Sequence, residues 1–157
     1  MLRVLSIAIT TLLLVGAVLV GTAVVQEKRA REFSEEIAQE IYETWDYEVV
    51  RSNAIEKMRD NEEMAVQGPT MFKWGGESLG TLERLGSPKG GAGIRWGARS
   101  PLRGFYAEYS FDARFSAGAV LLDIELMFEG GQWRLAGTRF NSPVLAAKMS
   151  SAGAPTL

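Results

Sequence analysis

Carboxylate side chains alternate with apolar residues in two neighbouring stretches of the sequence, and they are the first candidates for chemistry. Glu108 and Asp112 lie in the first stretch, and Asp123 and Glu125 lie in the second. Two carboxylates in one cleft can act as an acid–base pair or hold a cation. The same alternation is typical of an antiparallel sheet with one solvated face, which is what we expect here. The rival interpretation is a pocket that contains Asp112, Asp123 and Trp74.

Two residue types on which most enzymes rely are absent from the chain. Among its 157 residues there is no His and no Cys. The sequence therefore excludes thiolate nucleophiles, disulfides, cysteine-bound clusters and the usual imidazole base or metal ligand. A net charge of −2 gives no electrostatic reason to expect a nucleic acid as partner. We expect no catalytic residue, no cofactor and no metal.

A basic stretch with one aromatic residue is the best candidate for a contact with a partner. It holds Arg95, Trp96, Arg99 and Arg103. Cations beside an aromatic ring suit phospholipid headgroups or an acidic protein surface. Exposed arginines also keep loops soluble, and that interpretation stays open.

The N-terminal residues form a run that is long and apolar enough for a membrane span. Residues Val4 to Val25 carry no charge over 22 positions. As a helix this run would be about 33 Å long, which matches a hydrocarbon core of about 30 Å. A cleaved signal peptide ending at Gly21-Thr22-Ala23 is the alternative, but its apolar core is normally only about 7–15 residues long. We therefore predict an uncleaved transmembrane anchor over residues 1–26.

The side of the membrane on which the remainder lies follows less directly from the sequence. Arg3 stands before the apolar run, whereas Lys28, Arg29 and Arg31 follow it. Counted alone, these cations place the following domain in the cytoplasm. The signal-like layout of the N-terminus, and the family resemblance given below, favour the opposite side. We expect a single-pass protein whose domain lies outside the cytoplasm.

The acidic stretch after the anchor has the periodicity of an amphipathic helix. The apolar residues that share one face of this helix are Ala30, Phe33, Ile37, Ala38, Ile41, Tyr42 and Trp45. Asp46 then stands where it can cap a short following helix. Asn53 and Glu56 have the spacing of a capping box, which predicts a further helix to about Ala65.

Helix-breaking residues predict how the helical part ends. Gly68-Pro69 is expected to stop the helix. Residues 71–76 then form a loop. Ser78 is expected to cap a last short helix, whose apolar residues are Leu79, Leu82 and Leu85.

In the C-terminal half the period changes from that of a helix to that of a strand. Residues 89–93 are glycine-rich and predict a flexible lead-in to a short strand at 94–98. Alternation of apolar and polar residues predicts strands over 105–115, 120–128 and 133–140.

Two turns connect these strands. Gly130 and Gly131 predict a two-residue hairpin, because glycine takes a positive φ without strain. The other turn leaves two registers open. A two-residue loop at Ser116-Ala117 sets Ser110 opposite Asp123, whereas a longer loop sets Asp112 opposite Asp123.

Helices followed by antiparallel strands indicate the α+β class. The prediction is an N-terminal transmembrane helix, then a domain over residues 27–140 in which helices pack on a three- to four-stranded antiparallel sheet. Residues 141–157 are rich in Ala, Ser and Pro, and they predict a flexible C-terminal tail.

Three short motifs resemble those of a known class of small domains. They are Leu79-Gly80-Thr81-Leu82, Gly86-Ser87-Pro88 and Gly131-Gln132-Trp133-Arg134-Leu135-Ala136-Gly137. On these motifs the chain resembles small bacterial membrane-anchored domains of the cystatin-like superfold, in the nuclear-transport-factor-two-like group. It is similar, more weakly, to the anchored assembly factors of cytochrome oxidase and the accessory domains of the inner-membrane translocase. The resemblance implies a cystatin-like fold over about residues 33–140 and a place in the bacterial inner membrane.

The predicted function is that of a non-catalytic, membrane-anchored interaction module, an accessory or assembly subunit of a membrane protein complex. Its expected partners are the lipid bilayer and that complex, with no nucleic acid and no metal. The alternative is a small-ligand binder or a carboxylate-based enzyme with a pocket between sheet and helices. Enzymes of the superfold often pair a pocket Asp with His or Tyr, and this chain has no His.

Overall fold

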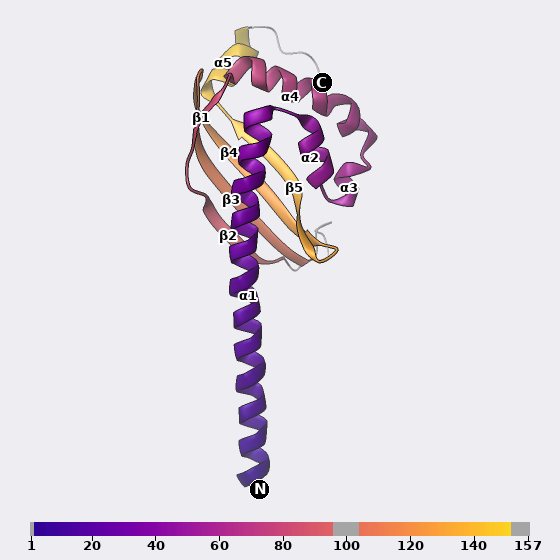
Figure 1. The fold of residues 1–157 in the computed structure, drawn as a ribbon, viewed down its shortest axis with the longest axis vertical. Coiled ribbons are helices and arrows are strands. Elements are labelled where there is room, and N and C mark those ends of the chain that lie inside the picture. Colours follow the sequence, from indigo (N-terminus) through magenta and orange to yellow (C-terminus); the bar gives the residue numbers. More distant parts are fainter. Residues whose placement is uncertain (1, 96–103, 152–157) are drawn as a thin grey trace.

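The computed structural model describes the backbone of residues 2–95 and 104–151, and the side chains of residues 23–94 and 104–147. Helices come first, a sheet follows, and one more helix ends the described chain (Figure 1). The elements are α1 (Leu2–Thr44), α2 (Tyr47–Asn53), α3 (Glu56–Arg59), α4 (Glu62–Leu79), β1 (Leu82–Leu85), β2 (Lys89–Arg95), β3 (Gly104–Phe115), β4 (Gly118–Glu129), β5 (Gln132–Asn141) and α5 (Pro143–Ser151). The predicted α+β class is confirmed.

The sheet is antiparallel and has five strands within the described residues, against the three or four predicted. Its main order is β1-β3-β4-β5. Strand β2 also pairs with β3, so β1 and β2 share one edge of that strand: β1 pairs with its C-terminal end and β2 with its N-terminal end. Strand β5 forms the opposite edge of the sheet.

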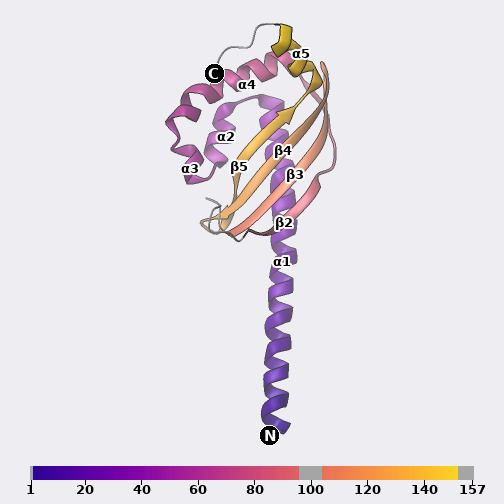
Figure 2. The same ribbon diagram turned by 180° about the vertical axis from the view of Figure 1, so that it is seen from behind.

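Helix α1 packs across one face of the sheet, and the core lies between them (Figures 1 and 2). The predicted helical stripe is confirmed: five of its residues are buried, and Phe33 and Trp45 pack against them partly buried. The buried members are Ala30, Ile37, Ala38, Ile41 and Tyr42. The sheet contributes every second residue of β3 and β4, as the alternation predicts. No helix covers the other face of the sheet in the described part of the chain (Figure 2).

Both hairpins have two-residue loops. Phe115 pairs with Gly118, so of the two open registers the structure has the one that sets Ser110 opposite Asp123. At the second turn Gly130 and Gly131 have φ of 60° and 86°, a conformation that favours glycine. The glycine hairpin is therefore confirmed.

Helix α4 overturns the prediction that Gly68-Pro69 ends a helix and that residues 71–76 form a loop. The helix runs through both residues to Leu79. A Cβ built on Gly68 would lie 2.2 Å from a ring carbon of Tyr47 in α2, so this glycine permits close packing of two helices. Pro69 removes one backbone donor, which the rest of the 18-residue helix tolerates.

The predicted helix boundaries on either side of this region are also wrong. The Asn53 side chain does not cap a helix: it donates to the carbonyl of Val49, and α4 is capped instead by Asn61. At the other end Gly80, with φ of 76°, terminates α4. Leu82 and Leu85 then lie in strand β1 rather than in a helix, because pairing with β3 outweighs their helix propensity.

Two glycine-rich or small-residue stretches are more ordered than predicted. The supposed lead-in at 89–93 is part of β2, where a Cβ on Gly90 would meet the backbone of Glu108. This glycine marks close approach of two strands. Residues 141–157, for which a flexible tail is expected, include helix α5, and its Leu145 is buried in the core.

Helix α1 is continuous from Leu2 to Thr44. No helix within the described side chains is long and apolar enough to cross a membrane. The side chains of residues 1–22, on which the predicted anchor over residues 1–26 depends, lie outside those described.

Candidate functional site

The outer edge of strand β5 is only partly covered. Ile55 donates its backbone N–H to the carbonyl oxygen of Leu135 at 2.9 Å, and Ala54 forms a parallel bridge with the same residue. Residues 136–138 continue the edge, and no strand of the described chain lies beyond them. An open edge of this kind is where a further strand can add to a sheet.

A β-bulge shapes the edge at the same place. Glu125 pairs with Gly137 and Leu126 pairs with Leu135, so Ala136 is an extra residue in β5. A bulge bends its strand and locally interrupts the ladder. It turns this part of β5 into one wall of a groove.

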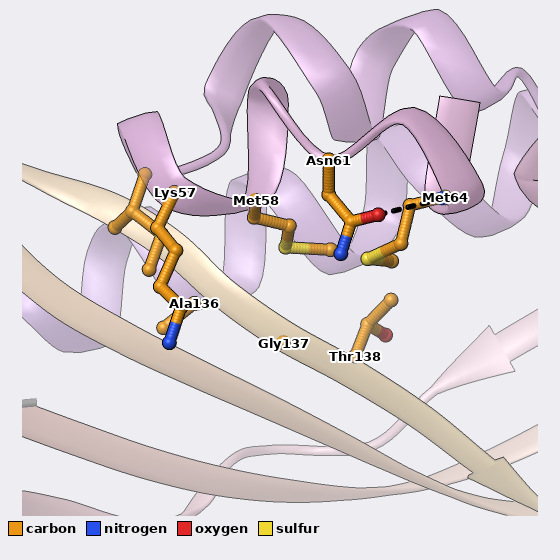
Figure 3. Close-up of a pocket in the computed structure, with 8 residues that line it drawn as sticks. Lys57, Met58, Asn61, Met64, Ala136, Gly137 and Thr138 are labelled. Atoms are coloured by element: carbon orange, nitrogen blue, oxygen red, sulfur yellow. Dashed lines mark hydrogen bonds between the residues drawn. The ribbon is translucent and has the colours of Figure 1, made fainter. Parts of the chain in front are cut away.

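The groove lies between the edge of β5 and the helical segments α3 and α4, and its volume is about 310 Å³. Its lining residues are Ile55, Lys57, Met58, Asn61 and Met64 on the helical side and Ala136, Gly137 and Thr138 on the strand (Figure 3). Most of these side chains are apolar, and two of them are methionines. Unbranched thioether side chains adapt their shape to what binds against them.

Few polar groups point into the groove, and each has a clear structural origin. Asn61 caps α4, and its Oδ1 accepts a hydrogen bond from the Met64 N–H at 3.1 Å, which directs the amide nitrogen toward the strand (Figure 3). Lys57 reaches toward Ala136 (Figure 3). An amide and an ammonium among apolar walls suit the binding of a peptide or a small apolar ligand.

Tyr42 lies behind the strand wall of the groove. Its hydroxyl and that of Thr138 are 2.6 Å apart. Burial raises the pKa of Tyr42 far above its ordinary value, so the phenol stays neutral and takes part in a hydrogen bond to Thr138. This contact fixes the strand wall to helix α1.

The carboxylates of the alternative pocket lie on the sheet face that points away from the helices. Asp112 is 2.5 Å from the Lys89 ammonium, and Asp123 accepts a hydrogen bond from the Ser110 hydroxyl at 2.6 Å. Their neighbours in sequence point into the core. Neither carboxylate lines a space between sheet and helices.

Glu108 and Glu125 are brought together, and one arginine contacts both and offsets one of their two negative charges. They are directly opposite each other in the register of β3 and β4. Arg139 contacts both, with Nη2 at 2.7 Å from Glu125 and 3.5 Å from Glu108. No group of acidic side chains suited to a metal ion occurs among the described residues. The arrangement is an ion-paired sheet face.

The remaining predicted residues do not join these carboxylates. Trp74 lies on α4, and its side chain is 37% exposed. Arg95 ends β2 opposite Gly104. The side chain of Arg95 and the other predicted contact residues, Trp96, Arg99 and Arg103, lie outside the described residues.

The groove is not predicted from the sequence, because the residues of its helical wall are assigned to one helix from Asn53 to about Ala65. Asn61 followed by Glu62 and Glu63 is itself an N-cap signal with acidic residues in the first turn. That signal identifies the break between α3 and α4. The bulge at Ala136 has no comparable mark in the sequence.

Comparison of the chain with protein-family models, with curated protein sequences and with solved structures gives no match.

Proposed function

We propose that this chain is a membrane-anchored binding module, an accessory or assembly subunit of a membrane protein complex, and that it binds an extended segment of its partner beside β5. Residues 1–26 would anchor it as a single-pass protein in the inner membrane of a bacterium, with the domain outside the cytoplasm. The domain would belong to the cystatin-like superfold. Support for that assignment is the order of the elements and the packing of one sheet face on a long helix.

The observation that carries the binding function is the open edge of β5 beside an apolar groove. A peptide strand laid along residues 136–138 gains main-chain hydrogen bonds from the edge. Its side chains on one face then enter the groove next to Met58 and Met64. Apolar contacts would supply affinity, while the Asn61 amide and the Lys57 ammonium would select polar groups of the partner.

The continuity of α1 supports the anchoring half of the proposal. The uncharged run of residues 4–25 and the buried stripe that begins at Ala30 belong to one helix. An anchored domain meets partners in the same membrane at a raised effective concentration. Modest affinity at the groove then suffices.

A small apolar ligand in the same groove is the second candidate. A volume of about 310 Å³ lies at the lower end of the range for ligand sites, about 300–1,000 Å³. Peptide binding is favoured because the open strand edge forms one wall.

The experiment uses the full-length chain in its native membrane, with a photo-crosslinking amino acid at position 58, which also lines the groove. Met64→Glu places a charge in the groove, whereas Val66→Glu places the same charge on the same helix at a side chain that is 76% exposed and does not line the groove. Mild-detergent purification and quantitative mass spectrometry identify what is crosslinked and what co-purifies.

We expect one membrane protein to crosslink through a single segment, and to be lost with Met64→Glu and retained with Val66→Glu. A charge facing an apolar partner costs about 1–3 kcal/mol, roughly a fivefold to hundredfold loss of affinity. Recovery of monomer alone, or of a companion that both variants retain, would overturn the proposal. Melting curves of the two variants check that the fold is intact.

A further inference from the structure

We propose that the end of the sheet at which α1 leaves the domain rests on the bilayer surface, with Ile94 and Phe105 in the headgroup region of anionic lipid. This inference rests on the proposed function, because it requires the anchor of residues 1–26.

Two side-chain contacts fix how α1 is aligned with β2. Arg31 donates through Nη2 to the carbonyl oxygen of Pro88 at 2.9 Å. Nearer the N-terminus, a Cβ on Gly91 would lie 3.5 Å from Oε1 of Glu27. The Tyr109 hydroxyl also donates to the Glu27 carbonyl at 3.3 Å. Helix and strand therefore run in opposite directions, with four helix residues beside three strand residues.

This alignment also determines which residues of α1 lie level with the C-terminal end of β2. Three residues beyond Gly91 is Ile94. Three strand residues span about 10 Å, the length of about six helix residues, so Ile94 lies level with about residues 20–23 of α1, the upper value following from the spacing of the two contacts. Residues 4–25 are the predicted span. The end of β2 thus reaches the last two turns of that span, and the helix between span and domain is unbroken. An unbroken helix leaves no linker that would lift the domain off the membrane.

Exposed apolar side chains gather at this end of the sheet. Ile94 and Phe105 face each other in the register of β2 and β3 and are 52% and 38% exposed. Phe105 packs edge to face on Phe128, with ring centroids 6.3 Å apart. Val24 and Val25, on α1 at about the same height, are 61% and 48% exposed.

The ribbon agrees with this placement. The ends of β2 and β3 and the hairpin between β4 and β5 lie on the side from which α1 projects, and α4 and α5 lie at the opposite end (Figures 1 and 2). The exposed apolar residues of α4, such as Val66 and Trp74, therefore belong to a different region.

Charge favours lipid over protein as the occupant of this end. Lys28 and Arg29, just beyond the predicted span, are exposed, and the Lys28 side chain is 77% exposed beside Glu32. Cations next to a span attract anionic phosphates, and apolar side chains at the same depth bury their surface among headgroups and acyl chains. The bilayer surface, these cations and the exposed apolar residues then lie at about the same position along α1.

The test uses the absence of cysteine from the chain. Single variants Ile94→Cys and Phe105→Cys are labelled with an environment-sensitive fluorophore. Val66→Cys and Leu121→Cys, which are also exposed apolar positions, are the matched controls. The full chain is reconstituted in vesicles of phosphatidylethanolamine and phosphatidylglycerol that carry a spin label on a headgroup. Flotation of the vesicles and alkaline extraction report the anchor separately.

We expect quenching at positions 94 and 105 to be several-fold stronger than at 66 and 121, with blue-shifted emission at the first pair. Equal quenching at all four positions in a chain that floats and resists extraction would overturn this inference and leave the anchor intact. A blue shift without quenching would also overturn it, because protein rather than lipid would then cover the patch. A chain that does not float would overturn the proposed function itself.

Discussion

The hydroxyl of Tyr42 in helix α1 and the hydroxyl of Thr138 in strand β5 lie 2.6 Å apart. Tyr42 is fully buried, and Thr138 lines the groove at the edge of the sheet. One side-chain pair therefore connects the helix that continues from the predicted anchor to the strand that would receive a partner. A shift of α1 relative to the sheet would therefore also displace Thr138 in the wall of the groove.

Tyr42→Phe is expected to lower the free energy of unfolding by about 1 kcal/mol near pH 7, the usual net value of one hydrogen bond. It should also change the alkaline limb of stability. Burial raises the pKa of Tyr42 above its ordinary value of 10.0, so this contribution to stability is complete below about pH 10. Above that pH the unfolded chain releases the proton and the folded chain does not, so stability falls as pH rises.

Urea unfolding measured between neutral pH and pH values above about 10 checks this prediction. The wild-type chain should lose stability more steeply than Tyr42→Phe in the alkaline range. Burial also raises the pKa of Tyr47 and of Tyr109, so the variant keeps part of the slope. Parallel curves for the two proteins would contradict the prediction.

Gly68→Ala is expected to destabilise the domain although it places a better helix former in α4. The gain in helix propensity is about 1 kcal/mol. Against it stands the new Cβ, 2.2 Å from a ring carbon of the buried Tyr47, and overpacking of this kind costs about 1–3 kcal/mol. The matched control is Gly93→Ala, where no atom lies within 4 Å of the added Cβ. A thermal melt should show a clear loss for the first variant only. A gain in melting temperature for Gly68→Ala would mean that α2 moves aside without cost.

Gly68 illustrates which parts of the fold can be predicted from the sequence and which cannot. Period-two alternation and the glycine pair at 130–131 predict β3, β4 and their partner β5, because local backbone preference and burial agree there. Gly68-Pro69 has the same composition as a helix end, but contacts with Tyr47 give it a different role. Such a contact joins residues far apart in sequence, and no local pattern reports it.

The candidate site divides in the same way. Carboxylates at alternate positions correctly predict a solvated sheet face, but not the arginine between Glu108 and Glu125, which comes from another strand. The groove needs the α3–α4 break and the bulge at Ala136 together. Its two walls are more than 70 residues apart in sequence, and the sequence alone gives no register between them.

Arg139→Met is expected to destabilise the sheet by about 0.5–1 kcal/mol, because it leaves Glu108 and Glu125 opposite each other without a cation. Adding Glu125→Gln in the same chain should restore most of that loss, since the like-charge contact disappears. A double-mutant cycle by urea unfolding at low salt measures the coupling. Independent, additive effects of the two substitutions would show that Arg139 does not act through Glu125.

Leu145→Ala is expected to lower the free energy of unfolding by about 2–4 kcal/mol, because Leu145 is only 4% exposed and its removal leaves a cavity. Leu121→Ala makes the same chemical change at a side chain that is 42% exposed on the outer sheet face, and it should cost clearly less. Unfolding curves of both variants compare the two positions. Equal, small losses would mean that α5 detaches without consequence for the core.

A single introduced cysteine can show on which side of the membrane the domain lies. Val66→Cys introduces the sole thiol of the chain at a side chain that is 76% exposed and lies on α4, outside the groove. An exposed substitution of this kind should change stability by less than about 0.5 kcal/mol. We expect a membrane-impermeant maleimide to label it in intact spheroplasts to the same extent as after lysis, because the domain is proposed to lie outside the cytoplasm. The residues that flank the span argue the other way, since Lys28, Arg29 and Arg31 outnumber Arg3. Labelling that requires lysis would show that these cations set the orientation, and it would place the groove in the cytoplasm.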